Sequence, residues 1–313
     1  MKDIFKNIYR KLYKAIELNK VKKINYALEK LYPYLDKNIV VENTEIKDNY
    51  PKYIWQLWFQ GENNAPPIVK KCLKSVKKYC PSEYKVIVLD NNTIEDWIEV
   101  SPIIKEKYNK GIINHAHYSD YIRTCLLAKY GGIWIDATVM LSDNIPQKIL
   151  EQYMFCFKNN LWYLHKTSPS IELFNYFLNL DNASGFYGSN WFFVSMPNNP
   201  IFILMKNILE QYWKIENKCC HYFMYHILFS LSVIENPVCK LNFDNMISLS
   251  NREPHLLQNS LYYPFDKNLF EEIKKMSPIH KLTYKFNTIK EGTFIDYLIN
   301  SDEQNFKGSN NND

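Results

Sequence analysis

Asp120, Arg123 and Asp136 are the residues whose types and spacing best suit chemistry, and they lie in one short stretch. A helix is predicted over 115–130, where Asp120 and Arg123 share a face because they are three residues apart. Two glycines then allow a tight turn, and Asp136 follows in an apolar run predicted as a strand. A carboxylate there is costly unless it pairs with a cation or binds a metal. The alternative is a local ion pair between Asp120 and Arg123, with Asp136 capping a turn.

The elements around this stretch alternate between strands and helices. Strands are predicted over 53–59, 84–89 and 133–141, the last one interrupted by Asp136, and helices over 66–80 and 115–130. This order is typical of an α/β domain with a mostly parallel sheet, in which ligands bind at the carboxyl ends of the strands. Gln60, Asp90 and Asp136 fall at or near such ends. Beyond residue 145 the pattern is helical and aromatic, apart from an irregular stretch over 181–200.

The basic residues concentrate at the start of the chain. The formal net charge of the 313 residues is +5, but residues 1–30 alone carry nine basic and three acidic residues. An apolar stripe from Ile4 to Ile16 makes this segment amphipathic. We expect residues 1–48 to form a helical extension, 49–300 the main domain and 301–313 a disordered tail. The extension either docks on the core as a helical hairpin or lies on an anionic membrane surface.

Composition and motifs argue against several classes of protein. The small net charge argues against nucleic-acid binding, since the chain beyond residue 30 carries 29 basic and 30 acidic residues. Seven scattered cysteines and the lack of a signal peptide favour reduced thiols in a cytoplasm. No apolar run makes a convincing transmembrane helix. Kinases and dehydrogenases are unsupported, because the sequence has neither GxGxxG nor GxxxxGK[ST].

The stretch from Ser119 to Thr138 resembles the sugar-nucleotide-binding core of GT-A glycosyltransferases. It is similar to the branch with glycosyltransferase family 32 and the large clostridial glucosylating toxins, where an S-D-x-x-R helix precedes G-G-x-Y-x-D-x-D. Over residues 50–290 the chain also resembles bacterial capsular polysaccharide synthesis proteins, with matching pieces at 54–61, 65–66, 188–192 and 280–285. The resemblance implies a GT-A-like fold, Rossmann-like with a mostly parallel central sheet, an N-terminal helical extension and a helical C-terminal portion.

The resemblance also implies roles for single residues around a nucleotide-sugar donor. Trp58 would stack on the nucleobase, and Gln56 and Asp90 would lie on the nucleotide side. The alternative for Trp58 is an aromatic residue of the core. Asn190 and Trp191 would face the donor sugar and the acceptor, and their alternative is a buried tryptophan beside a loop asparagine.

The resemblance also implies a catalytic group of charged residues, made of Asp120, Arg123 and Asp136. Ser119, Asp120 and Arg123 would bind the donor, Asp120 and Arg123 through hydroxyls of its sugar. Asp136 would bind ribose, a metal or both. His280 and Lys281 would close over the diphosphate, where Lys281 supplies a point charge. A lone histidine near the C-terminus is more often structural, so the role of His280 depends on the resemblance.

One position departs from the pattern of the family. The motif there usually ends in D-x-D, whereas this chain has Asp136-Ala137-Thr138. The second carboxylate normally binds a divalent cation that bridges the nucleotide phosphates, and Mn²⁺ and Mg²⁺ prefer hard oxygen ligands. We expect Asp136, Thr138 and His280 to hold such a cation. The expected affinity is low, because Thr138 offers only a neutral hydroxyl.

The expected function is that of a hexosyltransferase. The resemblance implies a retaining enzyme, and hence an α-linkage, with UDP-galactose or UDP-glucose favoured as the donor. The expected acceptor is an undecaprenyl-diphosphate-linked glycan in capsular repeat-unit synthesis, and the expected location is cytoplasmic and peripheral, on the inner face of the plasma membrane. One alternative is a toxin-like transferase that glycosylates a protein. The other is a non-catalytic subunit that binds a sugar nucleotide or glycan, which the D-x-T sequence favours.

Overall fold

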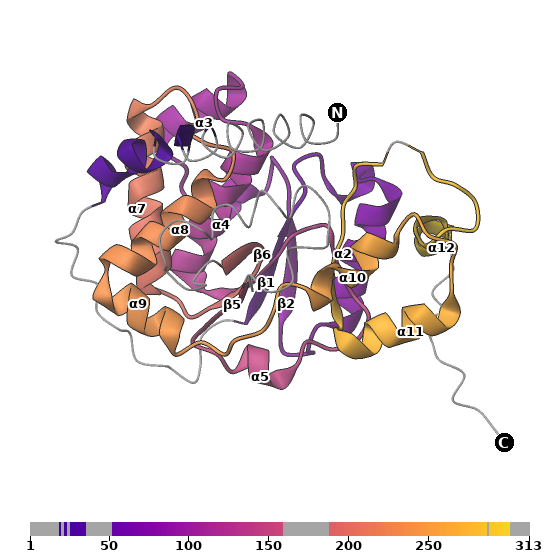
Figure 1. The fold of residues 1–313 in the computed structure, drawn as a ribbon. Helices are drawn as coiled ribbons and strands as arrows, with labels where there is room; N and C mark the ends of the chain where they lie inside the picture. The colour runs from indigo at the N-terminus through magenta and orange to yellow at the C-terminus, as the bar shows by residue number, and fades with distance from the viewer. Residues whose placement is uncertain are drawn as a thin grey trace, which may run out of the picture.

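A five-stranded sheet in the order β2-β1-β3-β6-β5 forms the centre of the molecule (Figure 1). The computed structural model describes residues 19, 22–23, 26–35, 52–158, 188–286 and 288–300. The strands of this sheet are β1 (Tyr53–Leu57), β2 (Lys85–Leu89), β3 (Gly132–Ile135), β5 (Met154–Lys158) and β6 (Gly188–Ser195). β1 pairs in parallel with β2 and β3, while β6 runs antiparallel to β3 and β5. Because only β6 is reversed, the predicted mostly parallel α/β sheet is confirmed.

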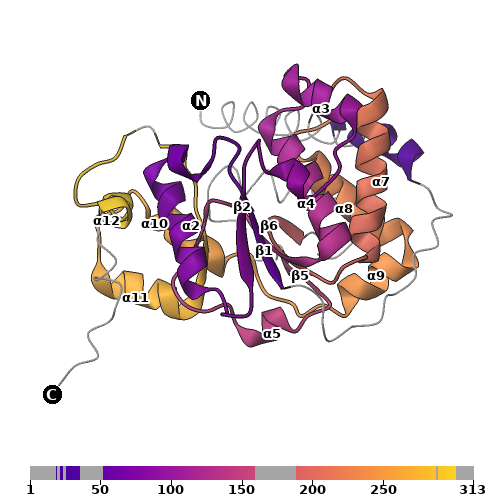
Figure 2. The ribbon, with the colours of Figure 1, turned by 180° about the vertical axis from the view of Figure 1, so that it is seen from behind.

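Helices cover both faces of this sheet (Figures 1 and 2). One side carries α3 (Pro102–Asn109), α4 (His115–Tyr130), α7 (Pro200–Ile215), α8 (Met224–Glu235) and α9 (Pro237–Asp244). The other side carries α2 (Pro67–Tyr79), α10 (Leu256–Ser260), α11 (Lys267–Met276) and α12 (Phe294–Asn300). Proline in the first turn starts α2, α3, α7 and α9, where its missing N–H costs no helical hydrogen bond.

A second, two-stranded sheet joins distant parts of the chain. β4 (Val139–Leu141) pairs antiparallel with β7 (Ile279–Lys281). The remaining elements are short: α5 (Gln147–Leu150) and the 3₁₀ turns η1 (Tyr32–Tyr34), η2 (Glu62–Asn64), η3 (Ile94–Asp96) and η5 (Glu253–His255). The helical C-terminal portion is therefore present as predicted, and its strand β7 returns to the middle of the molecule.

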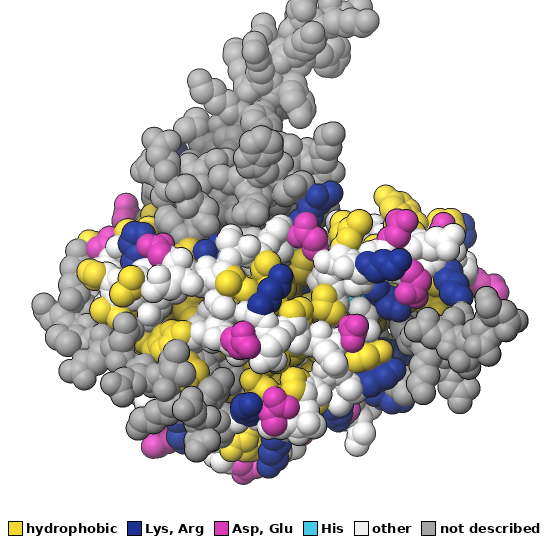
Figure 3. Space-filling view, turned by 90° about the horizontal axis from the view of Figure 1, so that it is seen from below, with side chains coloured by type: hydrophobic (Ala, Val, Ile, Leu, Met, Phe, Trp, Pro, Cys, Tyr) yellow, Lys and Arg dark blue, Asp and Glu magenta, His cyan; other side chains and the backbone are white. Residues whose placement is uncertain are grey.

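Two hydrophobic cores separate the layers. The larger one contains Trp55, Trp134, Phe193 and most of α4, α7 and α8. The smaller one lies between α2 and the C-terminal helices and includes Met140 of β4. On the face shown in Figure 3, basic and acidic side chains are interspersed and neither kind gathers into a patch. This mixture is consistent with the near-neutral charge of the body.

The turn from α4 into β3 requires glycine at two successive positions. Gly131 and Gly132 have φ values of +63° and +89°, in the left-handed region that disfavours other residues. A Cβ atom on Gly131 would lie 2.5 Å from the carbonyl oxygen of Ser195, and one on Gly132 would lie 2.5 Å from that of Tyr53. Backbone therefore approaches on both sides, and the turn fixes how α4 packs against β3, the strand that Asp136 follows.

The predicted strand over 133–141 is two strands in two different sheets. The chain turns after β3, where the amide of Val139 donates to the carbonyl of Asp136 at 2.9 Å, and β4 then pairs with β7. The prediction of one strand interrupted at Asp136 was wrong in joining the two halves, because the local sequence is apolar on both sides of this turn. Asp136 thus follows the carboxyl end of β3 instead of interrupting a strand.

Part of the N-terminal extension packs on the main body. Ala27, Leu31 and Leu35 are buried in the larger core, and the ring of Tyr34 meets that of Tyr212 on α7 edge-on at 5.7 Å. The amphipathic stripe over 4–16 and the expected disordered tail over 301–313 lie outside the described residues. Within the part of the chain that is described, no helix is long and apolar enough to span a membrane.

Candidate functional site

Four charged side chains of alternating sign form a chain of contacts beyond the carboxyl end of β3. The Arg123 guanidinium donates from Nη1 to Oδ1 of Asp120 at 2.6 Å and from Nη2 to Oδ1 of Asp136 at 3.1 Å. Lys281 donates from Nζ to Oδ2 of Asp136 at 2.8 Å. The structure thus brings together the three residues predicted to be catalytic, and the local ion pair between Asp120 and Arg123 is one link of a longer network.

Local sequence signals place the helical members of this network. The side chain of Asn114 accepts a hydrogen bond from the amide of His117 at 2.9 Å and so caps α4, which satisfies a free N–H of the first turn. Arg123 then lies over the rings of Trp134 on β3 and Tyr225 on α8, at 4.8 and 5.2 Å. These rings hold the guanidinium by cation–π attraction.

Burial and mutual attraction together set the protonation of the network. Burial alone raises the pKa of the Asp136 carboxyl, but the charges of Lys281 and Arg123 outweigh this and hold it below its ordinary value. Burial likewise lowers the pKa of Arg123, and Asp120 and Asp136 outweigh burial and raise it. Both groups are therefore charged at neutral pH.

His117 adds a further cation at the buried end of the network. Its Nδ1 lies 3.8 Å from Oδ2 of Asp120. Burial lowers the pKa of His117, but Asp120 and Cys219 outweigh burial and raise it to about 9. Nothing in the sequence analysis pointed to this residue. The available signal was its position three residues before Asp120, on the same face of α4.

Lys281 also contacts the residue that replaces the second carboxylate of the family motif. Its Nζ donates to Oγ1 of Thr138 at 2.7 Å, so one ammonium joins Asp136 and Thr138. The register of β4 and β7, in which Val139 pairs with Lys281, places the side chain there. Lys281 and Asp136 are the accessible members of the network, with side chains 19% and 24% exposed, whereas that of Arg123 is 3% exposed.

His280 is not brought to Asp136. It pairs with Met140 in the β4–β7 ladder, and neighbouring strand residues point to opposite faces, so His280 faces away from the side of Lys281. Its Nε2 lies 2.9 Å from Oγ of Ser142, and burial lowers its pKa to about 3. His280 is therefore a neutral histidine of the interior, and the structure separates it from the other two expected metal ligands.

The remaining groups around Asp136 do not fit a divalent cation. Oδ1 of Asp136 accepts from Arg123 and, at 2.9 Å, from Nε1 of Trp134, and Oδ2 accepts from Lys281. Within the described ranges, no cluster of three His, Cys, Asp or Glu side chains could hold a metal ion. Mg²⁺ and Mn²⁺ need several free oxygen ligands, whereas nitrogen donors already surround these oxygens.

Trp58 and Gln56 lie at the carboxyl end of β1. Trp58 is half-buried and meets the ring of Tyr284 edge-on at 5.1 Å, so the two rings form one aromatic pair. Gln56 is fully buried, and neither atom of its amide has a hydrogen-bond partner among the described residues. Nε1 of Trp58 is likewise without one there. Buried polar atoms without partners are uncommon in proteins, and each one needs an explanation.

The other predicted donor contacts have different surroundings. Oδ1 of Asp90 accepts from the amides of Asn92 and Thr93 and thus caps a turn. Trp191 is 4% exposed and stacks on Phe157 at 4.9 Å, as expected for a core aromatic residue.

Ser119 and Asn190 lie next to the charged network. Ser119 is half-buried on α4, beside Asp120. Asn190 on β6 donates from Nδ2 to Oδ1 of Asp120 at 3.3 Å. Of the two predicted residues on β6, Asn190 is therefore the one joined to the network.

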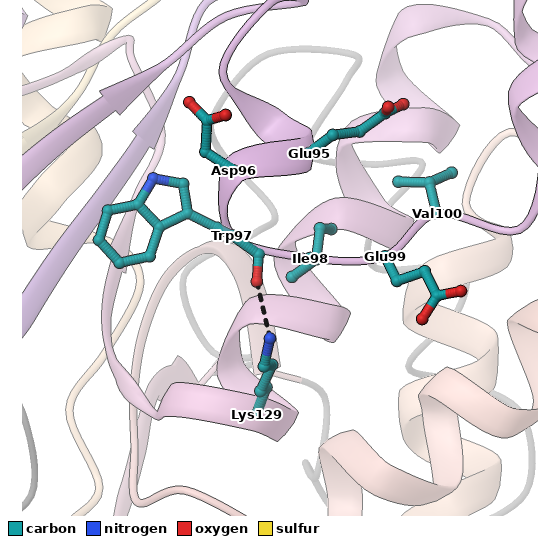
Figure 4. Close-up of a pocket in the computed structure, with 7 residues that line it drawn as sticks. All are labelled: Glu95, Asp96, Trp97, Ile98, Glu99, Val100 and Lys129. Carbon is teal, nitrogen blue, oxygen red and sulfur yellow. Dashed lines mark hydrogen bonds between the residues drawn. The ribbon is translucent and has the colours of Figure 1, made fainter.

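A separate hollow of about 320 Å³ lies at the opposite end of the sheet (Figure 4). It is lined by residues 95–100 and Lys129, whose Nζ donates to the carbonyl oxygen of Trp97 at 2.9 Å. The ring of Trp97 packs against Tyr53, the first residue of β1, at 5.3 Å. This hollow is therefore remote from the carboxyl ends of the strands and holds none of the predicted site residues.

Comparison with known families identifies the chain. A sequence model of the family described as "Capsular polysaccharide synthesis protein" matches residues 5–298. The chain belongs to this family. The match includes the Asp120, Arg123, Asp136 and Lys281 network and most of the N-terminal extension, so the family predicted from the motifs is confirmed.

Curated relatives of the chain are glycosyltransferases matched over a limited region. The "O-glycosyltransferase PaGT" of Phomopsis amygdali is 28% identical over 102 residues, covering 30% of this chain and 25% of the relative. The "O-glycosyltransferase braB" of Annulohypoxylon truncatum is 27% identical over 103 residues, covering 30% of this chain and 24% of the relative. The matched region thus spans about a quarter of either relative.

A solved structure titled "PaToxG Glycosyltransferase" aligns with 83% of this chain and 95% of its own. The sequence identity is 11% and the TM-score is 0.35.

Proposed function

We propose that this chain is a GT-A-type glycosyltransferase that transfers a hexose from a UDP-hexose to a lipid-linked oligosaccharide in capsular repeat-unit synthesis. The favoured donors are UDP-galactose and UDP-glucose. The observation that carries the proposal is the network of Asp120, Arg123 and Asp136, which ends in the accessible ammonium of Lys281. Carboxylates beside a sugar and a cation beside a diphosphate are the groups that sugar transfer requires. Membership of the capsular family and the glycosyltransferase relatives support the same activity.

In the proposed complex the donor extends from the aromatic pair to the buried network. Trp58 and Tyr284 contact the nucleobase. The diphosphate lies against Lys281, and hydroxyls of the hexose contact Asp120 and Asn190. Because Arg123 is pinned by both carboxylates and by two aromatic rings, it orients Asp120 and Asp136 without needing to move.

The proposed reaction retains configuration and gives an α-linkage. The bond between C1 of the hexose and the β-phosphate oxygen breaks, and its electron pair stays on that oxygen. The oxygen of an acceptor hydroxyl bonds to C1 on the same face, and its proton passes to the departing phosphate. The transition state has oxocarbenium character, so the Asp136 carboxylate, held ionised by its neighbours, favours the developing positive charge.

Release of UDP from a panel of UDP-hexoses tests the proposal. We expect the wild type to release UDP from one donor faster in the presence of a lipid-linked oligosaccharide, and Asp136→Asn to lose this release. The matched control is Asp143→Asn, an exposed aspartate in the loop after β4, which should leave the rate unchanged. Circular dichroism verifies that each variant is folded. Equal release by wild type and Asp136→Asn with every donor would contradict the proposal.

The second candidate function is a non-catalytic subunit that binds a sugar nucleotide. It is favoured by Thr138 in place of a carboxylate and by the nitrogen donors that occupy both oxygens of Asp136. Calorimetric binding of UDP without turnover of any donor, with or without acceptor, is the result expected for this function.

The proposed location is the inner face of the cytoplasmic membrane, where a lipid-linked acceptor is anchored. The basic N-terminal sequence supports it, because lysines and arginines attract anionic headgroups. Deletion of residues 1–20 leaves the packed residues 26–35 intact and should abolish co-sedimentation with phosphatidylglycerol vesicles. The double variant Lys11→Glu and Lys14→Glu should weaken it without shortening the chain. Unchanged co-sedimentation of both variants would exclude this location.

A further inference from the structure

Lys281 occupies the place between the two oxygens that the family motif offers to a metal. Its Nζ lies 2.8 Å from Oδ2 of Asp136 and 2.7 Å from Oγ1 of Thr138. The pairing of β7 with β4 sets this position, because Lys281 is opposite Val139, the residue after Thr138. A cation bound to both oxygens would stand beside the ammonium and be repelled by it. The site is thus already filled by a positive charge that belongs to the chain.

The charges of the motif agree with this arrangement. Two carboxylates of a D-x-D sequence carry two negative charges, which one divalent cation neutralises. In this chain Asp136 carries one negative charge and Thr138 none, and the single charge of Lys281 neutralises the pair. The exchange of a carboxylate for a hydroxyl at position 138 is therefore matched by a monovalent cation in place of a divalent one.

We propose that the ammonium of Lys281 supplies to the nucleoside diphosphate the positive charge that a divalent cation supplies elsewhere, so that this chain acts without a metal. The proposal rests on the proposed function. An ammonium has three N–H donors, and Asp136 and Thr138 accept two. The third is left for a phosphate oxygen, and the side chain is accessible enough to meet it.

The proposal assigns Lys281 a defined part in the bond exchange. When the bond between C1 and the β-phosphate oxygen breaks, the electron pair moves onto that oxygen, and the N–H of Lys281 donates to the charge that develops there. The acceptor oxygen bonds to C1 and its proton passes to the phosphate, so no proton leaves Lys281. Asp136 and Thr138 keep the ammonium in place throughout, since their oxygens accept from it before the nucleotide binds.

Calorimetric binding of UDP to the full chain, in EDTA and in MnCl₂, tests the proposal apart from turnover. We expect the same Kd for the wild type in both conditions. Lys281→Met should weaken binding by about 10- to 100-fold, as expected for the loss of one charge-assisted hydrogen bond, and Lys281→Arg should retain most of the affinity. The matched control is Lys240→Met, an exposed lysine on α9 paired with Asp244, which should bind UDP as the wild type does.

A double variant tests the exchange of cations directly. Thr138→Asp combined with Lys281→Met restores a D-x-D sequence and removes the ammonium. We expect it to bind Mn²⁺, seen as a loss of free Mn²⁺ signal in electron paramagnetic resonance, and to bind UDP more tightly in Mn²⁺ than in EDTA. The wild type should leave the free Mn²⁺ signal unchanged.

The outcomes separate the proposal from the function on which it rests. If the wild type binds UDP and releases it from a UDP-hexose only with Mn²⁺, the role of Lys281 is overturned and the transferase function stands. Unchanged UDP affinity in a folded Lys281→Met variant would overturn it as well. If the wild type binds neither UDP nor any UDP-hexose in either condition, the proposed function fails, and the role of Lys281 fails with it.

Discussion

Replacing Arg123 by methionine should remove several kcal/mol of folding stability. The Arg123 side chain is 3% exposed and bonds to two carboxylates, at 2.6 Å to Asp120 and 3.1 Å to Asp136. Methionine keeps the aliphatic stem but lacks the guanidinium that lies over the rings of Trp134 and Tyr225. The change therefore removes the charge, its hydrogen bonds and these cation–π contacts, and it leaves two negative groups facing each other.

The size of the effect follows from the partners that remain. Removing one partner of a buried ion pair costs about 3–5 kcal/mol. Asp120 keeps the amide of Asn190, and Asp136 keeps Trp134 and Lys281, so neither carboxylate is left alone. We therefore expect the lower end of the range, about 3 kcal/mol, which corresponds to a fall in Tm of roughly 4–6 °C for a chain of this length.

Urea unfolding at pH 7, followed by far-UV circular dichroism, measures this loss as a change in midpoint at constant slope. Lys240→Met is the matched control, because it breaks an exposed pair with Asp244 and should change stability by less than about 0.5 kcal/mol. Adding Asp120→Asn to Arg123→Met removes the carboxylate charge that has lost its guanidinium and should recover about 1 kcal/mol. A loss below 1 kcal/mol for Arg123→Met, or full additivity of the two changes, would refute the view that this network is a buried electrostatic unit.

The stability should also depend on pH, because burial lowers the pKa of His226 and of His255 to about 4 and that of His280 to about 3. The unfolded chain takes up these protons near pH 6.5, so stability present above that pH is lost toward pH 4, by at most about 1.4 kcal/mol per imidazole and pH unit. Tm measured from pH 7 to 4 should fall less steeply for His280→Gln, and parallel curves would contradict this. Gly132→Ala should lower the urea midpoint far more than Gly111→Ala. A Cβ atom at position 132 clashes with backbone, whereas one at position 111 meets nothing within 4 Å. Similar midpoints for the two variants would argue against the tight turn. Trp58→Ala should weaken UDP binding about tenfold in calorimetry through loss of an aromatic platform, and an unchanged Kd would assign Trp58 to the core alone.

Local signals were sufficient where an element depends on its own sequence. The helix predicted over 115–130 is observed at His115–Tyr130, because Asn114 caps its start and Gly131 ends it. The spacing of Asp120 and Arg123 on that helix likewise predicted their contact. The prediction for 133–141 was wrong in treating β3 and β4 as one strand. The pairing that separates β4 from β3 is with β7, which lies about 140 residues further along the chain. No local pattern reports such a pairing.

The same distinction applies to the site. The sequence pointed to Lys281 and His280 as a pair, but two neighbours in a strand face opposite sides, and only the register of β7 decides which one meets Asp136. Trp134, Tyr225 and Tyr284 were not singled out, because an aromatic residue in an apolar run has the same pattern whether it packs in a core or holds a functional group. Their roles depend on what packs against them.

The order of the charges explains how a nearly neutral protein can meet an anionic ligand. From the buried end outward the network runs His117, Asp120, Arg123, Asp136 and Lys281, and Lys281 is its accessible cation. Salt screens contacts between exposed charges over a Debye length of about 8 Å at physiological ionic strength. It screens contacts with partly buried charges much less. UDP affinity should therefore change little when NaCl is raised from physiological to several-fold higher concentration. A steep loss of affinity with salt would instead place the nucleotide against scattered surface lysines, away from Lys281.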